Sequence, residues 1–295
     1  MRKHRRRLSS VAAIIALAVS AGTVHSMDWP LSPPRLAATF GTFAKGRLIA
    51  GIALSSDDAL VRSAEDGELS FMMEEGSRIG VLPAPLGSLV VIEHQSGMAT
   101  LYSHLAPDSL SPVRTKPKKG DILGKSGTSG WIEGPGALFQ IFDRRVDSWV
   151  NPLLVLPALA DDKPPVVRSL ALSRGDKTYV LGETASLPQG TYKVSVDVAD
   201  PPDSSWTAAA LAPFIISLSI DGVEAVKDVF DVIKGVKGEF FLFSLTPAPV
   251  GGLRTLEGRY NLTERLFTRG KTAIALRVED AAGNKRSVSW TIVVE

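Results

Sequence analysis

Histidine and cysteine, the side chains that most often supply metal ligands and nucleophiles, are scarce in this chain. The 295 residues contain no cysteine and four histidines: His4, His25, His94 and His104. The lack of cysteine excludes disulfides, thiol catalysis and cysteine-ligated metal centres. A hydrolytic zinc site needs about three nitrogen or oxygen ligands and an open position for water. Histidine chemistry here is therefore limited to very few positions, and we interpret His94, before the Ser96-Gly97 turn, as a surface histidine at a strand end.

The N-terminal segment predicts export. Residues 2–7 are basic, residues 11–19 form an apolar run, and small residues follow up to Ser26. This order is typical of a secretory signal peptide, and the apolar run is shorter than the roughly 20 residues of a membrane span. We predict a signal peptide at residues 1–26, with an uncleaved anchor as the alternative. The exported chain would lie in the periplasm, cell envelope or outside the cell, with no stable membrane span.

Removal of that segment also changes the charge. It holds five basic residues and no acidic ones, so the formal charge falls from +2 to −3. A chain without a basic excess is not expected to bind nucleic acid.

The chain that follows has the pattern of an all-β protein. Residues 27–39 are a Pro-rich lead-in, and residues 40–157 alternate short apolar runs with Gly, Asp-Gly and Ser-Gly turns. Such runs predict strands, and a long amphipathic helix is missing. We expect a β-sheet domain over residues 40–157.

A second β-domain is predicted after a linker. Residues 158–166 contain Asp-Asp-Lys-Pro-Pro, a linker composition. Residues 167–295 then show alternating strands at 190–199 and 214–220, and a hairpin over 272–294 with a Gly-Asn turn. This spacing favours a β-sandwich. The pattern of residues 223–233 fits either a helix or a strand.

Several short motifs in the first domain occur in an order that resembles a known family. They comprise Thr100-Leu-Tyr-Ser-His-Leu105, Lys119-Gly-Asp-Ile-Leu-Gly124, Ser126-Gly-Thr-Ser-Gly130, Gly134-Pro135, Leu138-Phe-Gln-Ile141 and Val150-Asn-Pro-Leu153. This series resembles the lysostaphin-type, LytM-like zinc endopeptidases that cut peptidoglycan cross-links, over residues 40–156. The stretch Val278–Asn284 is similar to the final hairpin of bacterial Ig-like domains. The implied architecture is a LytM-like β-sheet domain followed by an Ig-like β-sandwich.

The resemblance assigns the family's zinc ligands to residues that cannot bind metal. Its first histidine falls on Ile49, its aspartate on Ala53 and its last histidine on Leu138, none of which has a donor atom. A catalytic histidine falls on Gly136, and only His104 keeps the family residue, as a catalytic-site position. We therefore expect no catalytic residue, no metal and no cofactor.

The same positions are candidates for a binding groove. With the ligands replaced by apolar residues, a groove lined by Ile49, Ala53, Tyr102, His104, Gly136 and Leu138 would be largely apolar. Such a groove could be filled by a neighbouring loop or could bind a protein segment. His104 is either a relic kept for packing or a binding residue.

The leading functional hypothesis is an exported, non-catalytic LytM-like protein. The resemblance implies that it binds peptidoglycan or regulates an envelope protein such as a wall hydrolase. One alternative is a zinc-dependent murein endopeptidase with an unrecognised metal site. Another is a structural envelope protein, since a fold does not by itself establish a function.

Overall fold

The computed structural model describes residues 27–44, 46–76, 84–111, 114–132, 134–184, 186–202, 211–242, 247–255 and 257–295. The predicted signal peptide lies outside these residues. Within them, the regular structure is β-strand apart from two short 3-10 helices, η1 (Pro152–Leu154) and η2 (Val250–Gly252). The all-β prediction is confirmed. None of the helices in these residues has the length and apolarity needed to cross a membrane.

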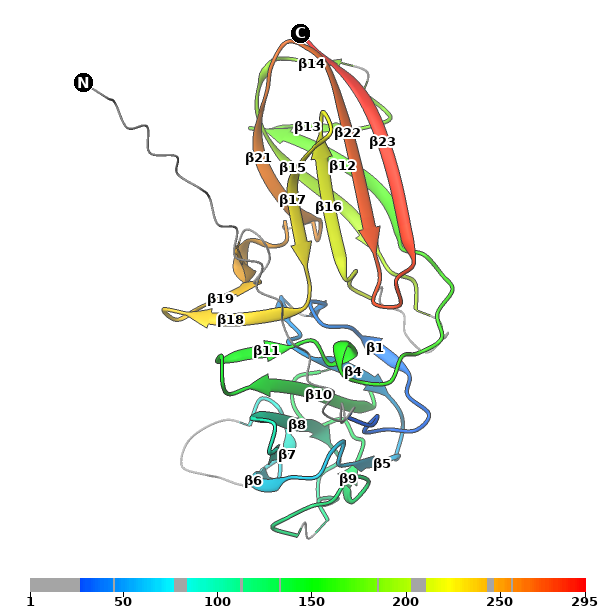
Figure 1. Ribbon diagram of the computed structural model, residues 1–295, viewed down its shortest axis with the longest axis vertical. Coiled ribbons are helices and arrows are strands. Elements are labelled where there is room, and N and C mark those ends of the chain that lie inside the picture. The colour runs from blue at the N-terminus through cyan, green and yellow to red at the C-terminus, as the bar shows by residue number, and fades with distance from the viewer. Residues whose placement is uncertain are drawn as a thin grey trace, which may run out of the picture.

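The N-terminal region is built on a large antiparallel sheet whose strands differ in length (Figure 1). Ten strands belong to it, counted over the described chain. In order across the sheet they are β20 (Ala248–Pro249), β19 (Glu239–Leu242), β18 (Val232–Val236), β11 (Ser148–Val150), β10 (Gly136–Asp143), β8 (Met98–Leu105), β7 (Ser88–Glu93) and β6 (Glu68–Met73), with β4 (Ile52–Ser55) beside the first half of β10 and β1 (Leu36–Ala38) beside β4. Two small ribbons flank it: β2 (Phe43–Ala44) with β3 (Arg47–Leu48), and β5 (Leu60–Arg62) with β9 (Ile122–Lys125).

One face of this sheet forms the core of the N-terminal region. Strand side chains alternate between faces, and one set of alternate residues, including Ile52, Val90 and Phe139, is fully buried. The Pro-rich lead-in completes this core with Met27 and Leu31. The lead-in is therefore part of the folded domain.

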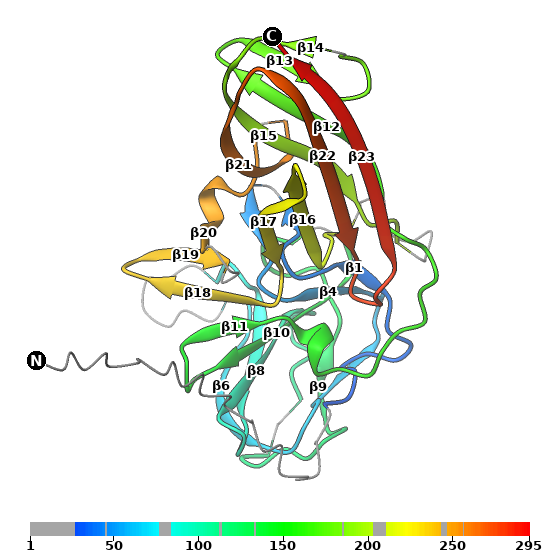
Figure 2. The same ribbon diagram turned by 45° about the horizontal axis from the view of Figure 1, so that its top comes forward.

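The C-terminal region consists of two sheets around one core (Figures 1 and 2). The first contains β13 (Lys177–Val180), β12 (Val166–Arg174), β15 (Gly190–Ala199) and β21 (Tyr260–Phe267). The second contains β14 (Ser186–Leu187), β23 (Lys285–Val294), β22 (Gly270–Glu279), β16 (Ile215–Ile220) and β17 (Val223–Val229). Both sheets bury residues in one cluster, with Val196 from the first and Leu276 from the second. The expected hairpin is β22–β23. Residues 223–229 and 232–233 prove to be strand, with a turn at residues 230–231 between them.

Three C-terminal strands cross over to the N-terminal sheet. After β17 the chain leaves the sandwich, and β18 pairs antiparallel with β11, so that Ile233 lies opposite Trp149. Strands β19 and β20 extend the same sheet further. The N-terminal residue Phe40 is buried in turn in the core of the sandwich. The two regions therefore share a sheet and a core, although the linker expected at 158–166 separates them in sequence.

Candidate binding groove

The structure brings together the three positions that the resemblance assigned to zinc ligands. Strand β4 pairs with β10 so that Ala53 lies opposite Leu138, and Ile49 precedes β4. Ala38 on β1 lies opposite Ala53 on its other side. These four side chains form a separate buried cluster, packed against partly buried apolar residues of which Trp131 is the largest.

The side chains of this cluster do not fit a zinc ion. Zinc sites in proteins use nitrogen, sulfur or carboxylate oxygen ligands, and Ile49, Ala53 and Leu138 offer none. The exposed fractions of these three residues are 3%, 6% and 3%, so the space between them is filled by hydrocarbon. Apolar burial of this kind contributes to stability roughly in proportion to the area removed from water.

Gly136 has a packing role that prevents a simple return to histidine. A Cβ atom at this position would lie 2.2 Å from the carbonyl oxygen of Leu54 on the neighbouring strand. Any side chain here would force the backbones of β4 and β10 apart. The residue at the family's catalytic histidine position is thus fixed as glycine by the close approach of the two strands.

Both ring nitrogens of His104 contact backbone carbonyl groups. The residue is 2% exposed, and its Nε2 lies 2.7 Å from the carbonyl oxygen of Gly134. Its Nδ1 is hydrogen-bonded to the carbonyl oxygen of Ser129. A general acid or base needs a ring nitrogen within reach of substrate or water, and both nitrogens here are occupied. The ring thereby holds the backbone carbonyl groups of Ser129 and Gly134 at fixed positions.

Tyr102 lies away from the apolar cluster. It is opposite Phe139, which faces the core, whereas its neighbour Ser103 is opposite Leu138. The Tyr102 ring packs on Phe139 with centroids 5.2 Å apart, and its hydroxyl oxygen accepts a hydrogen bond from the Ala64 N–H. Burial raises the pKa of this phenol, which stays neutral. Tyr102 is a core residue and not part of the groove.

The interpretation of His94 as a surface residue is wrong. It is 6% exposed, with Nδ1 2.9 Å from the Asp66 carbonyl oxygen and Nε2 2.8 Å from Thr100 Oγ1. The strand-end position was correct, but the loop at Asp66–Gly67 covers the ring. Sequence pattern alone does not show which distant loop closes over a strand end.

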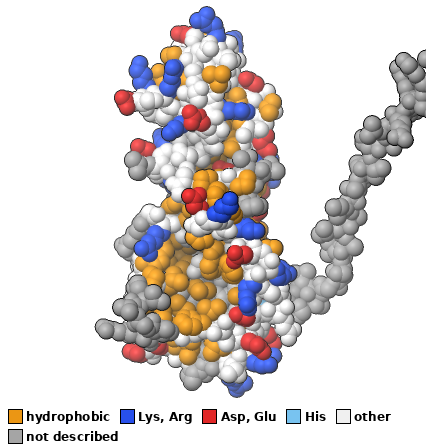
Figure 3. All heavy atoms as spheres, turned by 90° about the vertical axis from the view of Figure 1, so that its left-hand side faces the viewer, with side chains coloured by type: hydrophobic (Ala, Val, Ile, Leu, Met, Phe, Trp, Pro, Cys, Tyr) orange, Lys and Arg blue, Asp and Glu red, His pale blue; other side chains and the backbone are white. Residues whose placement is uncertain are grey.

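An apolar groove adjoins the cluster. Its volume is about 460 Å³, within the usual range of roughly 300–1,000 Å³ for ligand pockets. Figure 3 shows apolar side chains gathered in a hollow over the N-terminal sheet, below the β18–β19 hairpin. The groove lining includes Ile49, Leu138, Leu86, Trp131, Trp149, Ile233, Phe240 and Val250.

Both regions of the chain contribute to this groove. Trp149 on β11 packs edge-on against Phe142, with ring centroids 4.9 Å apart. Phe240 on β19 is 52% exposed, and Arg47 lies over the Trp131 ring at 5.5 Å. These residues were not predicted from the sequence. Trp131 directly follows the Ser126–Gly130 motif, and this position could have marked it as a groove residue. No feature of the sequence indicates that Phe240 lines the same groove.

The comparisons with known proteins agree with the N-terminal resemblance. Residues 47–152 match the model of Peptidase family M23, and residues 164–295 match a second family model that has no functional description. An uncharacterized protein of Treponema pallidum (strain Nichols) is 25% identical over 133 residues, which are 41% of this chain and 89% of that protein.

A second relative is much longer than the region of similarity. Cell division protein DipM of Caulobacter vibrioides (strain NA1000 / CB15N) is 26% identical over 160 residues, which are 52% of this chain and 24% of DipM. The match therefore spans about a quarter of DipM.

Solved structures show lower similarity. A chain of the SpoIIQ-SpoIIIAH pore-forming complex is 23% identical, with a TM-score of 0.37, and the match covers 44% of this chain and 90% of that one. Lysostaphin is 14% identical, with a TM-score of 0.35, over 92% of this chain and 99% of that one.

Proposed function

Because residues 47–152 form a LytM-like domain of the Peptidase family M23 type, we propose that this protein is a non-catalytic member of that group. In this proposal the chain is exported to the cell envelope, where the domain binds another molecule and hydrolyses nothing. The C-terminal sandwich, which we assign as Ig-like, is followed in sequence after β17 by β18, β19 and η2, and these elements supply one wall of the binding groove.

The observation that carries the non-catalytic role is the filled ligand site. Metal-dependent hydrolysis requires a cation that activates water and polarises the carbonyl group. Ile49, Ala53 and Leu138 pack against one another where the resemblance would place that cation. Neither His104 nor Gly136 offers a group that could act as a base in its place.

The chemistry of the groove favours a protein segment as its occupant. Its lining is largely aliphatic and aromatic, and aromatic residues in desolvated pockets carry much of the energy of protein interfaces. Peptidoglycan, with its sugars and charged peptides, would leave many polar groups unpaired there. We therefore favour an envelope protein such as a wall hydrolase over peptidoglycan itself. The name of DipM as a cell division protein agrees with a role in wall remodelling.

The binding role is tested with a wall hydrolase of the same organism. The purified chain is added to the hydrolase, and muropeptide release and complex formation are measured for wild type and Trp149→Ser. The matched control is Leu266→Ser, an exposed site on β21 away from the groove. We expect binding and any stimulation to fall by at least about tenfold in the groove variant only. Sedimentation with intact peptidoglycan that is independent of Trp149 would contradict the proposal.

A further inference from the structure

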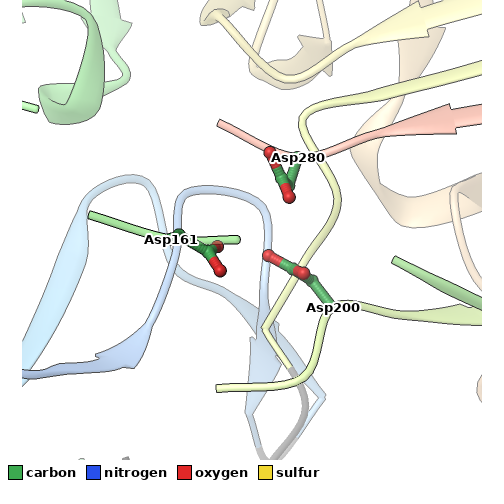
Figure 4. A group of neighbouring side chains, drawn as sticks. All are labelled: Asp161, Asp200 and Asp280. Carbon is green, nitrogen blue, oxygen red and sulfur yellow. The ribbon is translucent and has the colours of Figure 1, made fainter. Parts of the chain in front are cut away.

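Three aspartates meet where the linker joins the C-terminal sandwich. Asp200 follows β15 of one sheet, Asp280 follows β22 of the other, and Asp161 lies in the linker. Each offers a carboxylate oxygen, and these oxygens lie within 4.8 Å of one another. Figure 4 shows the three carboxylates turned toward a common space. Among the residues that the structure describes, this is the one cluster of metal-binding side chains.

The cluster is deeply placed for a group of acids. Asp200 is 4% exposed and Asp280 is 1% exposed. Buried carboxylates are normally paired with a cation or fully hydrogen-bonded, because removal of a charge from water is costly. Three of them together add mutual repulsion, which is strong at short distance in a medium of low dielectric constant.

One oxygen in the cluster has no partner within the protein. The Oδ1 atom of Asp200 is buried and accepts no hydrogen bond. Buried polar atoms of this kind are rare, and each points to a missing partner. The unpartnered atom belongs to the residue whose carboxylate faces both other aspartates.

Hydrogen bonds hold the other two aspartates in place around this oxygen. The Asn284 N–H donates to Asp280 Oδ1 at 2.8 Å, and Asn284 Nδ2 donates to Asp280 Oδ2 at 2.9 Å. Asn284 Nδ2 also lies 3.1 Å from the carbonyl oxygen of Asp161, which joins the linker to the β22–β23 turn. The Lys163 N–H donates to Asp161 Oδ1 at 3.0 Å. A carboxylate oxygen can accept more than one partner, so these bonds orient the ligands without using them up.

We propose that Asp161, Asp200 and Asp280 bind one calcium ion at the junction of the linker and the sandwich. The donor set is entirely oxygen, which suits a hard divalent cation and gives no nitrogen or sulfur ligand for zinc. Calcium accepts irregular, flexible oxygen ligation, whereas magnesium demands a near-ideal octahedron. The ion would fasten the linker to the ends of strands from both sheets, and so fix how the sandwich meets the LytM-like domain. This site is separate from the apolar groove, and its test does not depend on the proposed function.

Calcium binding is measured on the purified chain by titration calorimetry and by thermal unfolding, after removal of divalent ions with a chelator. We expect one calcium ion per chain and a rise in Tm, because a ligand that binds only the folded state stabilises it. Asp161→Asn and Asp200→Asn should each weaken the affinity by at least roughly tenfold, since one of three charged ligands is lost. The matched control, Asp162→Asn, alters the exposed neighbour in the linker and should bind as wild type does.

A second readout reports on the linker itself. Hydrogen exchange of the backbone amides at residues 160–163 should slow when calcium is added to wild type, and not in Asp161→Asn. If Asp200→Asn fails to fold, the partly exposed Asp161 variant decides the question. Absence of binding up to about 5 mM calcium, which is above the roughly 0.1–1 mM dissociation constants of extracellular sites, would overturn the proposal. Binding of magnesium in preference to calcium, or calcium binding unchanged in Asp161→Asn and Asp200→Asn, would also overturn it.

Discussion

Two buried clusters in this protein differ in an instructive way. At the position where the family has zinc, Ile49, Ala53 and Leu138 form a packed apolar cluster that needs no ion or hydrogen-bond partner. At the junction of the linker and the sandwich, three carboxylates face one another and one oxygen is unpartnered. The first cluster lies in the domain that resembles metalloenzymes, and the second lies outside it.

The difference shows that family likeness and local chemistry can point to different places. Strand pairing places Ala53 opposite Leu138, at positions to which the resemblance assigns metal ligands, although neither side chain has a donor atom. Apolar packing stabilises this position without a metal, because removal of methyl groups from water is favourable without any ligand. Buried carboxylates have no such alternative, and need a proton, a cation or a full set of hydrogen bonds.

The largest effect is expected when an acid is returned to the apolar cluster. Ala53→Asp places a carboxylate among Ile49, Leu138 and Ala38 with no cation to pair it. We expect the free energy of unfolding to fall by about 3–5 kcal/mol, the usual cost of an uncompensated buried charge. Urea denaturation checks this. Ala275→Asp, an equivalent change at an exposed strand position, should cost less than about 1 kcal/mol. Equal losses in both variants would show that the cluster is not apolar and closed.

Asp228 is a buried acid outside both clusters, and its protonation should make the stability of the fold depend on pH. Burial raises the pKa of Asp228 on β17 to about 6 from the ordinary 3.8. Because the folded state holds the proton more tightly, this residue stabilises the fold below about pH 4, and its contribution is lost between pH 4 and pH 6. Asp228→Asn should therefore raise the free energy of unfolding above pH 6.5 by about 3 kcal/mol relative to its effect at pH 4.

Urea unfolding at a series of pH values measures this difference. Asp176→Asn, on the exposed turn between β12 and β13, serves as the control and should leave the pH dependence as in wild type. If the free energy of unfolding had the same pH dependence in Asp228→Asn as in wild type, the raised pKa assigned to Asp228 would be contradicted.

A smaller effect is expected at the histidine retained from the family pattern. His104→Asn keeps the left-handed backbone (φ 65°), which asparagine tolerates, but shortens the side chain. Loss of the contact between Nε2 and the Gly134 carbonyl oxygen should lower the free energy of unfolding by about 1–2 kcal/mol. Thermal and urea unfolding measure the loss. A fall in murein hydrolysis with unchanged stability would instead make His104 catalytic.

The smallest effect on stability is expected at the open edge of the groove. Phe240 is half exposed, so Phe240→Ala should change the free energy of unfolding by less than about 1 kcal/mol. It should nevertheless reduce affinity for a protein partner, as is expected for Trp149→Ser. Surface plasmon resonance with the hydrolase used above compares the two variants. A large loss of stability would mean that β19 holds the two regions together rather than presenting a binding surface.

The parts of this structure that the sequence predicted are those set by local pattern. Alternation and turn residues identified the β22–β23 hairpin and β15, and the motif order placed Ala53 and Leu138 at equivalent family positions. Strand pairing then brought those two residues face to face.

The parts that were missed depend on contacts between distant segments. The pairing of Ile233 with Trp149 joins residues more than 80 positions apart, and no local pattern encodes it. The aspartate cluster likewise joins a linker and the ends of strands from two sheets. Asp280 was visible only as part of a turn, because its burial and its neighbours come from the packing of the sandwich.

The central claim is that the LytM-like domain has no catalytic zinc. The most direct test is the zinc content of the purified chain after dialysis against zinc, together with muropeptide release from purified murein. We predict zinc well below one ion per chain, no release, and the same result for Asp200→Asn, which removes the only cluster of acidic ligands found in the described chain. One zinc ion per chain that persists in Asp200→Asn, with muropeptide release that a chelator abolishes, would contradict the account.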